Sequence, residues 1–189
     1  MRGAYGWRMK LVLAVLALGM CLPLVGADKD KPLPKDFKSL KALAEKGDVR
    51  AQYELGWRYA NGKKGVEQDF KEAMKWHRKS AEQGFGYSQH DLGLMYANGQ
   101  GVKKDFNEAV KWYRKYAEQA TASDIYANAM GFEKGEYGPI DNVVAYMWYN
   151  VAAVKGETKA KTARDLLAKK MTRAQITKAL EFSKELLKK

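Results

Sequence analysis

Two almost identical stretches that recur 37 residues apart constrain the fold of this chain more than any other feature. YANGKKGVEQDF runs from Tyr59 to Phe70, and YANGQGVKKDF runs from Tyr96 to Phe106. The two stretches begin and end alike, but the first has one extra residue in its middle. Repeats of this length are typical of solenoids, in which each unit packs only against its neighbours.

The similarity extends to both sides of these stretches. Four segments align in pairs, 44–62 with 81–99 and 65–83 with 101–119. A third copy follows at an offset of 36, in which Phe132 takes the place of Tyr96. The YAN triplet at Tyr126 is then a coincidence, because its alignment with Tyr96 would leave six extra residues before the tryptophan that follows.

Each unit is predicted to form a hairpin of two helices, because apolar residues recur at helical spacing and strand patterns are weak. The first helices are expected at about 48–61, 86–98 and 122–134, and the second helices at about 69–83, 105–120 and 141–155. Within the first helix of unit one, Ala51, Leu55 and Tyr59 lie four residues apart and form one apolar stripe.

Aspartates are predicted to start the second helices. Asp69 and Asp105 are each followed three residues later by a glutamate, which is the arrangement of a reciprocal capping box. Asp141 can also cap its helix, but it lacks this glutamate. Asn-Gly pairs after the first two helices suit the left-handed residue that often ends a helix.

Large and small residues at equivalent positions predict the packing between helices. Trp76, Trp112 and Trp148 recur once in each second helix and are expected to anchor the core. Gly56 and Gly93 each cost about 1 kcal/mol of helix propensity relative to alanine. A glycine at the same position of two units therefore indicates that another element approaches closely there.

The segments outside the repeats are predicted to cover the ends of the stack. Residues 36–47 would form a capping helix after a flexible leader at 28–35, and 159–170 and 171–189 would form two amphipathic helices. Thr172 with Gln175 predicts a capping box. Five apolar residues are expected to close the last face: Leu166, Leu167, Ile176, Leu180 and Leu187.

The first 27 residues have the pattern of a secretory signal peptide. Three basic residues precede an uncharged apolar run of 15, and Val-Gly-Ala ends at Ala27 before the charged residues begin. Cleavage there would remove the only cysteine and lower the net charge from +12 to +9. The sequence therefore predicts a periplasmic or secreted protein without disulfides; an uncleaved N-terminal anchor is the alternative.

The repeats resemble the Sel1-like repeats, which are related to tetratricopeptide repeats. Unit two carries AEQG, LGLMYANGQGV and the spaced Asp, Ala, Trp and Ala of the family pattern, and unit three matches best at AYMWYNVAAVKG. The resemblance covers about 44–182 and implies an all-α, right-handed α-solenoid that serves as a protein-interaction scaffold. The expected organisation is a signal peptide at 1–27, a leader and capping helix at 28–43, three repeats at 44–156 and capping helices at 157–189.

The resemblance also implies a binding groove on the first helices of the units. By analogy with tetratricopeptide repeats, residues on either side of the Leu-Gly pair point into it: Tyr53, Trp57, His90, Leu94, Tyr126 and Met130. Aromatic anchors in such a groove suit an extended or helical peptide. The alternative is that several of these side chains only pack between repeats.

The sequence contains no pattern typical of catalysis, cofactor binding or metal binding. The GKKGV loop lacks the spacing of a phosphate-binding loop, and no serine or threonine lies in a nucleophile elbow. His77 and His90 are the only histidines and are predicted to be unclustered, with His77 at an aromatic structural position. We therefore expect a non-catalytic scaffold without a cofactor or metal. The alternatives are a hydrolase-type envelope enzyme and a basic solenoid that binds nucleic acid.

The positive charge favours an acidic protein or peptide as partner, or peripheral contact with an anionic membrane surface. Much of the charge lies in the C-terminal helices, where a solvated surface without a partner is the alternative. A basic helical solenoid can bind RNA, but nucleic acid is not an expected partner of an exported protein.

Overall fold

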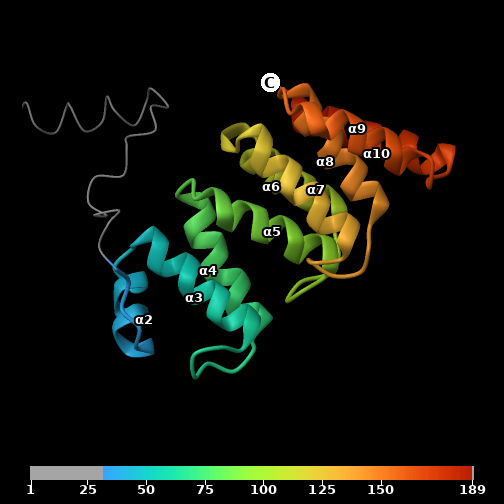
Figure 1. Cartoon of the computed structure of the whole chain (residues 1–189). Coiled ribbons are helices and arrows are strands. Elements are labelled where there is room, and N and C mark those ends of the chain that lie inside the picture. Colours follow the sequence, from blue (N-terminus) through green and yellow to red (C-terminus); the bar gives the residue numbers. More distant parts are fainter. Residues whose placement is uncertain (1–31, 189) are drawn as a thin grey trace, which may run out of the picture. The chain divides into compact units, whose positions relative to one another are not determined.

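The computed structural model describes residues 32–188, which form helices and no strand (Figure 1). The predicted signal peptide at 1–27 and the first residues of the predicted leader lie outside this described part. The helices are α2 (Phe37–Glu45), α3 (Val49–Asn61), α4 (Phe70–Glu82), α5 (Gly86–Asn98), α6 (Phe106–Gln119), α7 (Ala122–Lys134), α8 (Asn142–Val154), α9 (Thr158–Ala168) and α10 (Arg173–Leu187). The predicted helices of the three units agree with α3 to α8 to within about one residue at each end.

The described part is an all-α repeat solenoid. Three antiparallel hairpins follow one another along the chain, α3 with α4, α5 with α6 and α7 with α8 (Figure 1). The helix α4 packs against α5, which joins the first two hairpins. The ring of Tyr113 on α6 contacts Phe132 on α7 and Trp148 on α8, which joins the second hairpin to the third. No helix in the described residues is long and apolar enough to cross a membrane.

The same backbone hydrogen bond closes all three hairpins. The N–H group of Asp69 donates to the carbonyl of Tyr59 at 2.9 Å, and Asp105 donates to Tyr96 at 2.9 Å. Asp141 donates to the carbonyl of Phe132 at 3.3 Å. The third bond confirms the predicted register, in which Phe132 and not Tyr126 is equivalent to Tyr96.

The aspartates cap the second helices as predicted. The prediction of reciprocal capping boxes at Asp69 and Asp105 is wrong, because the glutamates do not bond back to the aspartates. The side chain of Asp69 accepts hydrogen bonds from the N–H groups of Lys71 and Glu72. Asp105 and Asp141 likewise accept from the N–H groups of the residues two and three positions after them. The glutamate cannot return a bond to the aspartate N–H, because that group already donates to the end of the preceding helix. Glu72 instead accepts from Lys75 and from Nε1 of Trp76.

The three equivalent tryptophans are buried, which confirms that they anchor the core. The two glycines also mark close approaches, as predicted. An added Cβ at Gly93 would lie 2.1 Å from Cε1 of Tyr113, and one at Gly56 would lie 2.9 Å from the ring of His77. Each glycine therefore makes room for the aromatic side chain that the second helix presents at that position.

The N-terminal end of the stack is more ordered than the sequence predicted. The predicted capping helix is α2, whose Leu40 and Ala44 form a small core with Leu55 and Trp76. The end of the predicted flexible leader is fixed by Arg58, a side chain only 1% exposed. Its guanidinium donates to the carbonyl of Lys35 at 2.9 Å and to that of Pro34 at 3.4 Å, because a buried cation requires acceptors.

The C-terminal helices cover the stack with three of the five predicted side chains, since Leu167, Ile176 and Leu187 are in the main core or pack against it. Leu167 is buried, but Leu166 and Leu180 are 55% and 38% exposed. In α10 the buried stripe runs through Ala179, Ser183 and Leu186, so small residues let the helix approach α8 and α6. The predicted capping box of Thr172 and Gln175 is present.

We expect Gly93→Ala to lower the free energy of unfolding by about 1–3 kcal/mol, because the new methyl group overlaps the buried ring of Tyr113. Urea denaturation of the purified protein measures this. Gly86→Ala is the matched control, since the atoms nearest to its Cβ would belong to the exposed side chain of Gln119, at 3.1 Å or more. A Gly93→Ala protein as stable as the wild type would contradict the close packing described here.

Candidate functional site

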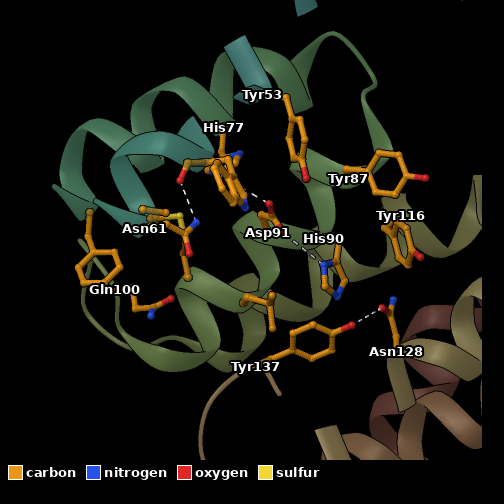
Figure 2. A pocket seen from close by; sticks show the side chains of 15 residues that line it. Tyr53, Asn61, His77, Tyr87, His90, Asp91, Gln100, Tyr116, Asn128 and Tyr137 are labelled. Carbon is orange, nitrogen blue, oxygen red and sulfur yellow. Dashed lines mark hydrogen bonds and ion pairs between the residues drawn. The ribbon is translucent and has the colours of Figure 1, made fainter. Parts of the chain in front are cut away.

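A pocket of about 430 Å³ lies on the first two units (Figure 2). Its walls come mainly from α3 and α5, with two side chains from α4 and one each from α6, from α7 and from the loops that follow α5 and α7. Four of the six predicted groove residues line it: Tyr53, Trp57, His90 and Leu94. Tyr126 and Met130 are not among its lining residues.

Tyr126 and Met130 pack within the third unit. The ring of Tyr126 lies 5.6 Å from that of Tyr149, and Met130 packs against the main core. The Tyr149 hydroxyl donates a hydrogen bond of 2.7 Å to Glu133 on α7. The contacts of these two residues are therefore packing contacts, which is the alternative that the sequence left open for the groove residues.

The same pair of rings occurs at equivalent positions in all three units. Tyr53 lies 5.7 Å from His77, and His90 lies 6.0 Å from Tyr113, as Tyr126 lies near Tyr149. The position on the second helix is therefore an aromatic structural position, as predicted for His77. Unit one differs from the other units in having a histidine, His77, at this position. Unit two differs in having a histidine, His90, at the position on the first helix.

The prediction that the two histidines are unclustered is wrong, because both lie beside the carboxylate of Asp91. Nδ1 of His90 is 3.3 Å from Oδ1 of Asp91, and Nε2 of His77 is 3.9 Å from Oδ2 (Figure 2). Stacking of the first two units brings the second helix of one beside the first helix of the next. The sequence shows only that Asp91 follows His90, and it gives no direct sign that His77 faces them across this interface.

The carboxylate determines which nitrogen of His90 carries the proton. A carboxylate only accepts hydrogen bonds, so Nδ1 of a neutral His90 donates to Asp91 and Nε2 is left as an acceptor. Nε2 of His90 is buried and has no hydrogen-bond partner among the described residues, and the same holds for Nδ1 of His77. Both imidazoles thus have a polar atom that the described part of the chain leaves unsatisfied.

Burial controls the ionisation of the pocket side chains. It lowers the pKa of His77 below 6.5, and the nearby negative charge of Asp91 opposes this shift only in part. Burial, followed by the charges of Asp91 and Glu54, raises the pKa of Tyr53 to about 12. Burial likewise raises the pKa of Tyr116 to about 12. At neutral pH these two tyrosines are therefore uncharged and can donate a hydrogen bond.

The loop with the extra residue reaches back to the pocket rim. Nζ of Lys63 lies 5.3 Å from the ring centre of Trp57, and Nζ of Lys64 lies 5.7 Å from it. Lys64 also pairs with Glu54 at 2.6 Å. The loop is a turn, as predicted, but its two lysines also cover one wall of the predicted groove.

Several pocket residues were not identified from the sequence. Tyr87 and Asp91 lie on α5, Tyr116 on α6, and Tyr137 on the loop after α7, where its hydroxyl donates to Asn128. The sequence did offer one indication of an aromatic site here. Phe85 and Tyr87 are aromatic, whereas the third unit has Thr121 and Ser123 at the equivalent positions. The described residues contain no group of three or more His, Cys, Asp or Glu side chains that could hold a metal ion.

Comparison with known families agrees with this repeated geometry. The Sel1 repeat model matches the chain three times, at residues 49–85, 86–120 and 126–156, which together make up more than half of its length. The chain belongs to the Sel1 repeat family. Sel1 repeats typically serve as protein-interaction scaffolds, so the pocket on the first helices lies in a fold commonly used for binding.

Similar proteins include a plant protein and two bacterial proteins of known structure. One is the ERAD-associated E3 ubiquitin-protein ligase component HRD3A of Arabidopsis thaliana, with 36% identity over 67 residues. This match covers 35% of the chain but only 10% of the relative. The second, a Sel1 repeat protein from Oxalobacter formigenes, has 41% identity, a TM-score of 0.49 and coverage of 70% of this chain and 98% of that one. The third, c5321, a protective antigen of uropathogenic Escherichia coli with an SLR fold, has 26% identity, a TM-score of 0.36 and coverage of 79% and 40%.

We expect the stability of the protein to fall as the pH drops below about 6.5, the ordinary pKa of histidine. The lowered pKa of buried His77 means that the unfolded chain takes up a proton more readily than the folded one. Urea denaturation at several pH values measures this dependence.

The control is His77→Tyr, which places in unit one the residue of the other two units. Asp91, which faces this position, and His90 beside it remain in both proteins. The variant should lose less stability than the wild type over the same acid range. Equal losses would show that folding does not hold His77 in its neutral form.

Proposed function

We propose that this protein is a non-catalytic scaffold of the bacterial cell envelope that binds another protein or peptide through the pocket on α3 and α5. The observation that carries the proposal is the set of aromatic side chains at the pocket mouth. Tyr53, Phe85 and Tyr87 form a cluster with ring centres 5.2–6.0 Å apart, and Tyr87 is 65% exposed. Large aromatic side chains at an accessible pocket are common anchors for protein partners.

The family supports an adaptor role. The related HRD3A is by its description a component of a larger ligase, so its Sel1-like segment belongs to a protein that works with others. The location in the periplasm or outside the cell rests on the signal-peptide pattern at 1–27. The net positive charge favours a partner that is acidic as a whole, and peripheral contact with anionic lipid belongs to the same proposal.

Two other functions have less support. An envelope hydrolase needs a nucleophile or a metal-bound water beside its acid and base. The His77–Asp91–His90 cluster has no serine, threonine or cysteine among the residues that line its pocket. Nucleic-acid binding through this pocket would require lysine or arginine there, and none is among its described lining residues.

We expect Tyr53→Ala combined with Trp57→Ala to weaken binding of the natural partner about 30-fold, which corresponds to the loss of about 2 kcal/mol from a binding hot spot. The partner is first captured from an envelope extract, and its affinity for the purified proteins is then measured by calorimetry.

The control for this experiment is Leu166→Ala, which changes an exposed apolar residue on α9, outside the pocket lining. This variant should keep the wild-type affinity. If the double variant remains folded and binds the partner as tightly as the wild type, binding does not depend on this pocket.

We expect the exported protein to begin at Asp28, because cleavage after Ala27 follows the small residues of the predicted signal peptide. Cell fractionation followed by intact mass measurement tests this. Leu16→Arg is the matched control, since a charge in the apolar run should block export. A protein that retains Met1 in the envelope would show that the segment is an uncleaved anchor.

A further inference from the structure

We propose that the pocket binds the cationic side chain of a lysine or arginine in the partner peptide, with Asp91 as its counter-ion and aromatic rings as its walls. This inference rests on the proposed function and specifies the residue type that the site recognises. The pocket is lined by one carboxylate and six tyrosine, tryptophan or phenylalanine side chains, with no lysine or arginine among the described lining residues.

Asp91 differs in its partners from Glu54, the other carboxylate that raises the pKa of Tyr53. Glu54 pairs with Arg58 and Lys64, so its negative charge is balanced by permanent cations. The ion pairs that Asp91 makes within the described residues are with two imidazoles, at 3.3 and 3.9 Å. Burial favours the neutral form of His77, so this imidazole does not act as a permanent cation beside the carboxylate.

The carboxylate can be reached by a ligand. The side chain of Asp91 is 26% exposed, whereas those of His90 and His77 are 9% and 2% exposed. Figure 2 shows Asp91 between the rings of His77 and His90, with the ring of Tyr53 above it. An incoming side chain would therefore meet the carboxylate directly, with the imidazoles behind it.

Two buried imidazole nitrogens near the carboxylate have no hydrogen-bond partner in the described residues, Nε2 of His90 and Nδ1 of His77. When Nδ1 of a neutral His90 donates to Asp91, its Nε2 is an acceptor. Unsatisfied polar atoms cost free energy when buried, so this end of the pocket is polar and suits a donor-rich ammonium or guanidinium group.

The walls have the chemistry of a cation site. The face of an aromatic ring carries partial negative charge and attracts an ammonium or guanidinium group within about 6 Å. Tyr53 and Tyr87, with ring centres 6.0 Å apart, stand at the entrance. The ring of Trp57 already attracts two ammonium groups of the chain, those of Lys63 and Lys64.

The negative charge of Asp91 also extends across the pocket. After burial, Asp91 is the largest cause of the raised pKa of Tyr53, and it adds to the effects of burial and Glu136 on the pKa of Tyr137. An acidic side chain or an anionic lipid headgroup in the same place would be repelled. A partner that is acidic as a whole can still present one basic anchor residue here, with its acidic residues near the lysines of the rim.

The test uses four acetylated and amidated alanine peptides of five residues, which carry lysine, arginine, norleucine or glutamate at the centre. Their binding to the purified protein is followed by NMR titration. We expect the lysine or arginine peptide to bind at least about tenfold more tightly than the norleucine peptide, which has nearly the same shape but no charge. The glutamate peptide should bind weakest.

Asp91→Asn keeps the shape of the side chain and an acceptor oxygen for His90, and it should abolish the preference for lysine or arginine over norleucine. Asp165→Asn, at a carboxylate on α9 that is 58% exposed, is the matched control and should keep that preference. Tyr87→Ala, at a ring that is 65% exposed, should weaken binding of the basic peptides while the protein remains folded.

The proposal is overturned if norleucine binds as tightly as lysine and arginine, if Asp91→Asn keeps the preference, or if glutamate binds best. It is also overturned if neither basic peptide shows saturable binding at millimolar concentration. These outcomes are distinct from failure of the proposed function, which is decided by the Tyr53 and Trp57 double variant with the natural partner.

Discussion

The backbone hydrogen bond from each capping aspartate to the end of the preceding helix is the interaction on which the rest of the structure depends. It joins Asp69 to Tyr59, Asp105 to Tyr96 and Asp141 to Phe132, so each hairpin turns at the same place. The aspartate side chain then caps the second helix. Because each hairpin turns in the same way, its second helix presents an aromatic ring to the first helix at one fixed position. The pocket follows from this regularity, since it forms where the first two units stack.

The sequence predicted the repeated parts of the fold well because they depend on local and periodic information. Caps, glycines and tryptophans recur at fixed offsets, so the helix limits and the register of unit three could be predicted. The predicted capping boxes of Asp69 and Asp105 do not form, because the N–H group of each aspartate donates to the end of the preceding helix. Leu166 and Leu180 were misassigned because the C-terminal helices pack through small residues such as Ala179 and Ser183, for which the repeat gives no precedent.

The pocket was predicted only in part, for a related physical reason. Tyr53, Trp57, His90 and Leu94 follow from the position of the Leu-Gly pair, which the repeat defines. The charge at the centre of the site depends on residues from two units, His77 on α4 and Asp91 on α5. A periodic sequence argument finds equivalent residues, but it does not find partners that meet across an interface. The unique residues Asp91, Tyr87 and Tyr137 therefore became recognisable as pocket residues only in three dimensions.

The most direct test of binding through this pocket is site-specific photocrosslinking in living cells. A photoreactive amino acid is introduced either at Tyr87, beside the pocket mouth, or at Leu166 on α9; both positions are well exposed. Binding through the pocket predicts a covalent adduct with the natural partner from position 87 and none from position 166. An adduct from position 166 alone would contradict it and would place the binding surface on the C-terminal helices.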